Sequence, residues 1–193
     1  MNDDTNSRRD TFDRLYSDDP DPWNVDTSSY ELQKRQAALD ILPNRRFSSV
    51  LDIGCGSGVL ALQLSNQNGD VVAVDVSRTA LKLAADRLKD KANVSFHVLE
   101  VPSEWPTGTF DLIVISEVLY FLSESEIIQT SQKAAECLAD EGVCLLVNWT
   151  GHNDLPVNGE QAAALFRASS RWSTLEHNED DTFRLDLLSL PQG

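Results

Sequence analysis

Three closely spaced glycines are the first residues in the chain whose pattern points to chemistry. Gly54, Gly56 and Gly58 follow the apolar run 49–53 directly and precede a stretch with helical character over 59–65. Glycines leave the main chain bare, so a ligand can touch it, and the first turn of the next helix offers free N–H groups. The pattern predicts a ligand-binding loop between a buried strand and a helix.

A carboxylate follows at the interval that a nucleoside site requires. Asp75 ends the next β-branched run, 21 positions after Gly54. At that place a carboxylate accepts hydrogen bonds from both hydroxyls of a ribose. Dinucleotide loops have the form G-x-G-x-x-G, but here Val59 stands where the third glycine would be, so a pyrophosphate fits poorly. The two features predict a site for a nucleoside without a pyrophosphate.

Strands and helices alternate around these residues. Apolar, β-branched runs predict strands, and amphipathic stretches predict helices. The expected strands are 49–53, 71–74, 94–99, 110–115 and 143–147, and the expected helices are 28–42, 59–65, 77–89 and 125–138, the last capped by Gly142. This order predicts an α/β fold, namely a Rossmann-like, doubly wound and mostly parallel sheet.

The C-terminal part departs from that alternation. After Gly151 a helix is expected over 159–169, followed by two strands over 172–176 and 182–188 with an acidic turn between them. Two successive strands joined by a tight turn pair antiparallel. The sheet is therefore predicted to have seven strands, with an antiparallel edge hairpin at the C-terminus.

The N-terminal segment allows two interpretations. Residues 1–20 are rich in Asp, Asn, Arg and Ser, which is typical of a mobile acidic tail. Phe12, Leu15 and Tyr16 are spaced for a short helix that docks as a lid. The remaining residues, 21–193, are expected to form a single domain, since the chain is too short for two ordinary ones.

The helix over 28–42 carries one charge of interest. Leu32, Leu39 and Leu42 recur at helical spacing and are expected to face the core. Lys34 either meets a carboxylate of the ligand or, as the simpler account, is an exposed charge.

Composition narrows the class of partner. The formal net charge is -15, with 31 acidic and 16 basic residues, so the average surface field repels nucleic acid and anionic membranes. No apolar run is long enough to span a bilayer, and the first residues lack the apolar core of a signal peptide. Cys55, Cys137 and Cys144 have no metal-ligand spacing. We expect a cytoplasmic protein with free thiols and no metal.

Asp52 extends the glycine loop to a D-x-G-x-G-x-G sequence, which resembles motif I of class I S-adenosylmethionine-dependent methyltransferases. Residues 110–114 look like motif IV of that family, and 138–143 are similar to its Leu-x-Pro-Gly-Gly segment, with Glu141 where Gly or Pro is common. The resemblance implies S-adenosyl-L-methionine as cofactor and S-adenosyl-L-homocysteine as product. It also implies that Glu100 lies near the adenine amine.

Two further stretches resemble the nodulation protein S (NodS) family of N-methyltransferases. They are Asp21-Pro22-Trp23 with Asp26-Thr27 and Tyr30-Glu31, and Ser116 to Leu122. Members of that family methylate the free amine of a partly deacetylated chitin oligosaccharide, which implies a small-molecule acceptor, in particular an amino sugar. An O-methyltransferase or other small-molecule methyltransferase, and a catalytically silent cofactor-binding partner protein, remain the alternatives. The oligomeric state stays open.

The candidate catalytic residues are Glu117, Tyr120 and Tyr30. Glu117 either binds the ammonium of an amine acceptor and passes its proton on, or contacts the cofactor or a nearby backbone amide. The two tyrosines are expected to cover the methyl site and pack on a sugar ring. The candidate cofactor-binding residues are Trp23, Asp52, Gly54, Cys55, Gly56, Gly58, Asp75, Val76, Glu100, Val101 and Ser116, of which Trp23 has a core position as its alternative.

Overall fold

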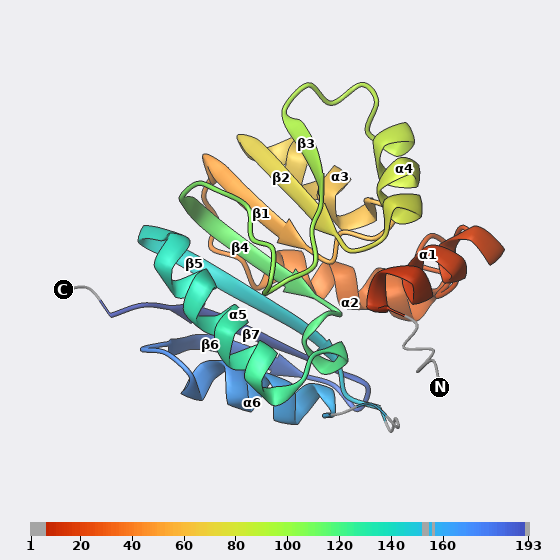
Figure 1. The fold of residues 1–193 in the computed structure, drawn as a ribbon. Coiled ribbons are helices and arrows are strands. Elements are labelled where there is room, and N and C mark those ends of the chain that lie inside the picture. Colours follow the sequence, from red (N-terminus) through yellow and green to blue (C-terminus); the bar gives the residue numbers. More distant parts are fainter. Residues whose placement is uncertain (1–6, 152–154, 156, 192–193) are drawn as a thin grey trace.

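The chain folds around a mixed sheet of seven strands within the residues that the structure describes (Figure 1). The computed structural model describes residues 7–151, 155 and 157–191. The strands lie in the order β3-β2-β1-β4-β5-β7-β6. They are β1 Ser49–Ile53, β2 Asp70–Asp75, β3 Val94–Val98, β4 Phe110–Ser116, β5 Leu138–Trp149, β6 Ser173–Glu179 and β7 Phe183–Ser189.

Helices separate the strands much as the sequence predicts. They are α1 Arg8–Asp18, α2 Ser29–Asp40, α3 Val59–Gln67, α4 Arg78–Arg87, the 3-10 helix η1 Leu119–Phe121, α5 Glu124–Cys137 and α6 Gly159–Ala168. Among the described residues, no helix combines the length and the apolar character that crossing a membrane demands.

The pairing of the strands confirms the predicted fold class. β1 pairs parallel with β2 and β4, β2 with β3, and β4 with β5, whereas β7 runs antiparallel to both β5 and β6. The strand order reverses between β1 and β4. In open α/β sheets this switch creates a crevice at the carboxyl ends of the strands, where ligands bind.

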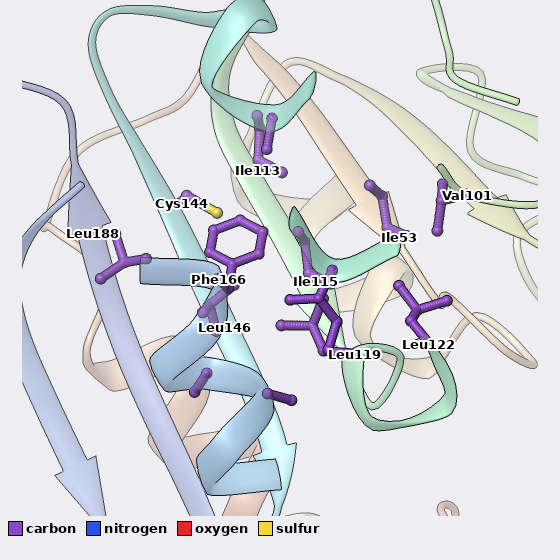
Figure 2. Close-up of a cluster of buried hydrophobic side chains, with 14 of the residues drawn as sticks. Ile53, Val101, Ile113, Ile115, Leu119, Leu122, Cys144, Leu146, Phe166 and Leu188 are labelled. Carbon is purple, nitrogen blue, oxygen red and sulfur yellow. The ribbon is translucent and has the colours of Figure 1, made fainter. Parts of the chain in front are cut away.

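Alternation along β4 explains why helices cover both faces of the sheet. Ile113 and Ile115 pack on one face beneath α5 and α6, in a cluster that includes Phe166 (Figure 2). Leu112 and Val114 point to the other face, into a cluster with residues of α2 and α3. Because both faces are buried, β4 is apolar almost throughout, as expected of a central parallel strand.

The junction of α5 and β5 differs from the prediction. Gly142 does not cap the helix but lies inside β5, which begins at Leu138 directly after the helix. Leu138 pairs with Phe110, and residues 139–142 then bulge before regular pairing resumes. The left-handed position falls on Glu141, with a φ of 60°, rather than on the glycine. Pairing with β4 ends the helix before any glycine cap is needed.

The buried face of α2 also differs from the prediction. Leu32, expected in the core, is 55% exposed, whereas Lys34 and Ala38 are buried. Leu39 and Leu42 are partly buried and pack against the cluster on that side of the sheet. The apolar spacing of the leucines misidentified the inner face because the surface beneath the start of α2 is polar, as the site below shows.

Over its described part, the N-terminal segment forms a helix, α1, that docks on the domain. Residues 1–6 lie outside the described part. Asp13 of α1 accepts hydrogen bonds from the Ser77 hydroxyl at 2.7 Å and from the Thr79 N–H at 3.0 Å, at the start of α4. Tyr16 is buried. The charges that made this segment look solvated are thus partly used to hold it on the domain.

Candidate active site

A cavity of about 540 Å³ lies at the carboxyl ends of β1, β2 and β4. α1 and α2 border it and lie near the sheet end toward which β1 and β4 point (Figure 1). Both the volume and the position are typical of a small-molecule site. The fold therefore places this cavity at the switch in strand order.

Most of the residues proposed from the sequence line this cavity. They are Trp23, Tyr30, Gly54, Cys55, Gly56, Asp75, Val76, Glu100, Val101, Ser116, Glu117 and Tyr120. They come from distant parts of the sequence, and the parallel strands bring them to one edge of the sheet.

Asp52 and Gly58 do not line it. Asp52 is fully buried, and because strand side chains alternate it shares a face of the sheet with Val50. Gly58 precedes α3 with a φ of 82°, and a Cβ there would lie 2.7 Å from Leu88 and 2.9 Å from Ala84. The third glycine thus allows α3 and α4 to pack closely and does not face the ligand space.

The glycine loop and the carboxylate after β2 are joined directly. The Gly56 N–H donates to Asp75 Oδ2 at 2.9 Å, and the Ser77 N–H donates to Oδ1 at 2.8 Å. Burial raises the pKa of Asp75, and these hydrogen bonds offset part of the rise. Gly56 has a φ of 53°, and a Cβ there would lie 2.7 Å from the Tyr16 hydroxyl. The loop accordingly has no room for a side chain.

Glu117 follows β4 and is almost fully engaged. Its Oε1 lies 2.7 Å from Lys34 Nζ, and its Oε2 accepts the Trp149 N–H at 3.1 Å and the Tyr120 hydroxyl. Lys34 Nζ also lies 2.9 Å from Glu31 Oε1. The backbone-amide contact that the sequence left open is therefore present.

Lys34 is a buried cation rather than an exposed one. Burial lowers its pKa, but Glu117 and Glu31 raise it by more, so the ammonium form is favoured. Its Nζ also lies 4.9 Å from the centre of the Tyr30 ring, within the range of a cation–π contact. Because its ammonium is already paired with two carboxylates, Lys34 is poorly suited to bind an anionic ligand.

Aromatic side chains form much of the outer wall. Phe12, Tyr16 and Trp23 line the cavity, and the Tyr16 and Trp23 rings meet edge to face at 5.5 Å. Trp23 is 42% exposed, which argues against the core position considered for it. Such a wall shields a bound ligand from water.

Sequence reasoning missed several lining residues on α1 and α2. Glu31, Arg35 and Ala38 line the cavity together with Lys34, which the sequence offers as a ligand contact. The spacing of the four residues is that of one helix face. The helical spacing of the charged residues Glu31, Lys34 and Arg35 could have indicated this face. The spacing of the leucines in the same helix predicted a different inner face instead. Arg8, which forms an ion pair with Glu100 at 3.1 Å, had no local signal at all.

The lining fits an adenosine with a charged amino acid tail. Asp75, Val76 and Leu99 line the cavity, so a carboxylate lies beside apolar side chains there. Arg35 donates to the Val25 carbonyl at 3.0 Å, yet its buried Nε has no partner among the described residues. A carboxylate on the ligand would satisfy that atom. In the part of the chain that is described, no group of three or more His, Cys, Asp or Glu is placed to hold a metal.

A family model and relatives in sequence match this chain. The model described as Nodulation protein S (NodS) matches residues 6–145. The Nodulation protein S of Azorhizobium caulinodans is 30% identical over 107 residues, 55% of this chain and 51% of that protein. The Magnesium-protoporphyrin O-methyltransferase of Rhodobacter capsulatus is 36% identical over 80 residues, 40% of this chain and 35% of that protein. The chain thus spans about half the length, or less, of these curated relatives.

A solved structure agrees in fold. The N-methyltransferase NodS of Bradyrhizobium japonicum, in complex with S-adenosyl-L-homocysteine, superposes with a TM-score of 0.84 at 21% identity, covering 95% of this chain and 98% of that one. At that identity the likeness supports the fold.

Proposed function

Because the chain belongs to the nodulation protein S family, we propose that it is an S-adenosylmethionine-dependent methyltransferase. The acceptor in this proposal is a small molecule with a primary amine, in particular an amino sugar. The solved NodS is named an N-methyltransferase, which supports nitrogen as the atom methylated. The small cavity favours a single sugar unit or the end of a chain as the part that enters.

One observation carries the proposal. A single cavity brings together the glycine loop with Asp75, the aromatic wall of Phe12, Tyr16 and Trp23, and the Glu117–Tyr120 pair after β4. The glycine loop with Asp75 supports binding of a nucleoside, and the aromatic wall supports exclusion of water. The Glu117–Tyr120 pair supports binding of a polar acceptor.

The chain's own residues divide the work of holding the cofactor. S-adenosylmethionine, when bound, supplies a methyl group already activated on a sulfonium. Asp75 would accept from the ribose hydroxyls, and Arg35 would pair with the carboxylate through its unsatisfied Nε. Glu100 and Val101 would lie at the adenine, and Ser116 and Cys55 beside the amino acid part. No nucleophilic residue is needed, because alignment and dehydration supply most of the rate in a direct displacement.

On the acceptor side, the tyrosines and carboxylates would orient the amine. Tyr30 and Tyr120 line the cavity and would pack on a sugar ring. An ammonium must lose a proton before its nitrogen can attack, and a neighbouring carboxylate binds the ammonium while water or the carboxylate takes the proton. Tyr120 donates to Glu117, so this pair forms one fixed polar wall.

The test is a methyl-transfer screen with labelled S-adenosylmethionine over amino sugars, simple amines and phenols. We expect labelled product and released S-adenosyl-L-homocysteine with at least one amine. Gly56→Val is the inactive control, because a side chain there meets Tyr16 and fills the loop. Transfer only to phenols would favour the O-methyltransferase alternative, to which the O-methyltransferase relative lends support.

A cofactor complex without transfer to any acceptor would favour the third possibility, a catalytically silent partner protein. Calorimetry of cofactor binding does not distinguish that case from an enzyme. Release of S-adenosyl-L-homocysteine in the presence of an acceptor does, and it is therefore the deciding measurement.

A further inference from the structure

Glu31 occupies a helix position that usually serves to cap, but it does not cap. It is the third residue after Ser28, the N-cap of α2. In α5 and α6 the residues at this position, Glu126 and Gln161, accept from the N-cap N–H at 2.8 and 3.1 Å and complete a capping box. The side chain of Glu31 makes no such bond.

The local chain explains this difference. The Ser28 N–H donates to the Asn24 carbonyl at 2.8 Å, so it needs no side-chain acceptor. The Glu31 carboxylate therefore does not cap the helix, and Glu31 lines the cavity. Its side chain is only 15% exposed, and a carboxylate at that depth requires cationic partners.

The ion pair with Lys34 leaves one oxygen of the Glu31 carboxylate without a partner among the described residues. Glu31 Oε1 contacts Lys34 Nζ at 2.9 Å, whereas Oε2 has no hydrogen-bond or ion-pair partner among the described residues. Glu117 differs, because its Oε2 already accepts from the Tyr120 hydroxyl and the Trp149 N–H. Its Oε1 is in an ion pair with Lys34 and is buried, without a hydrogen-bond partner among the described residues, so a ligand reaches it less easily. Glu31 is therefore the more available of the two carboxylates for a further donor.

The charge balance points to the kind of donor. Glu31 and Glu117 share one ammonium, that of Lys34, which their charges keep protonated. The three side chains together retain one negative charge. Arg35 also lines the cavity, but its unsatisfied Nε is the group assigned above to the carboxylate of the cofactor. A second ammonium would neutralise it, and a hydrogen bond between two charged groups is about twice as strong as one between neutral groups.

We propose that Glu31 binds the ammonium of the methyl acceptor through Oε2 and selects amines over neutral analogues of the same shape. This proposal rests on the proposed function. It moves the acceptor contact from Glu117, which the sequence favoured, to a residue on α2. The α-ammonium of the cofactor has the same chemistry, so binding of S-adenosyl-L-homocysteine has to be measured in the same variant.

The experiment measures binding of glucosamine and of N-acetylglucosamine to the full chain saturated with S-adenosyl-L-homocysteine, by calorimetry. We expect the parent protein to bind glucosamine at least roughly tenfold more tightly than the neutral sugar, the size expected for one charged hydrogen bond. In Glu31→Gln this preference should fall to within about twofold, while affinity for S-adenosyl-L-homocysteine stays within about twofold of the parent.

Glu124→Gln is the matched control. It removes one negative charge from the exposed first turn of another helix, and we expect it to leave the preference for glucosamine intact. Melting curves check that each variant is folded. The proposal is overturned if the parent protein shows no preference, if Glu31→Gln keeps it, or if Glu31→Gln loses S-adenosyl-L-homocysteine, since the last result assigns the ammonium to the cofactor. Failure of the parent to bind S-adenosyl-L-homocysteine would overturn the proposed function itself.

Discussion

Among single residues, Asp75 has the most direct role to test. It is buried, accepts from Gly56 and Ser77, and lines the cavity. If it binds the ribose, Asp75→Ala should weaken binding of S-adenosyl-L-homocysteine by roughly 1 to 3 kcal/mol, because the hydroxyls lose a charged partner. Calorimetry measures the change. Asp86→Ala, an exposed site on α4, should bind as the parent does; equal affinity of the two variants would remove Asp75 from the ribose.

Asp52 affects stability rather than ligand contact. Neither of its oxygens has a partner among the described residues, and burial together with the charge of Asp75 raises its pKa to about 7 from an ordinary 3.8. Between those values the folded state holds a proton that the unfolded state has lost, so this carboxyl costs stability as the pH rises through that window.

Replacing Asp52 by asparagine removes that cost. The variant should melt several degrees above the parent at a pH of about 8 and gain much less at a pH of about 4, by scanning calorimetry. Asp70→Asn, at an exposed strand end, is the control without such a pH-dependent gain. A gain in Asp52→Asn that does not change with pH would show that the carboxyl is not the cause.

At the level of elements, one hydrogen-bonded carboxylate, that of Asp13, helps to hold α1 on the domain. Burial raises the pKa of Asp13, but hydrogen bonds from Ser77 and Thr79 outweigh it and lower the pKa below the ordinary value. The ionised form therefore stabilises the docked helix, and this contribution is lost as the pH falls through the lowered pKa.

Removing that carboxylate should loosen α1. Asp13→Ala loses a cap-like bond to the start of α4, typically about 0.5 to 2 kcal/mol, and should speed tryptic cleavage at Arg14 without a matching change in global Tm. Asp18→Ala changes an exposed residue on the same helix and is the control. Unchanged cleavage in Asp13→Ala would mean that the aromatic contacts of Phe12 and Tyr16 suffice to hold the helix.

The whole molecule should respond to the cofactor product as one unit, because residues from α1 to the end of β5 line the cavity. S-adenosyl-L-homocysteine at a hundredfold excess over its Kd should stabilise the fold by about 2.7 kcal/mol and raise Tm by roughly 5–10 °C. Gly56→Val should show no shift. A shift of equal size in that variant would place the ligand outside the glycine loop.

The sequence by itself determined the features that are local along the chain. The strands, the glycine loop and Asp75 could be predicted because each is fixed by a short run of residues and its neighbours, and parallel strands necessarily end at one edge of a sheet. The fold class followed from the order of those runs.

Only the tertiary structure decided which faces point inward. Lys34 is buried and Leu32 exposed because two carboxylates from separate elements compensate the ammonium, a fact that no helix pattern contains. In the same way, α5 ends where β5 pairs with β4 and not at a cap formed by Gly142. The Ser28 N–H donates to a backbone carbonyl, so the Glu31 side chain is not needed as a cap and lines the cavity. These outcomes depend on long-range contacts, whose energies outweigh local propensity.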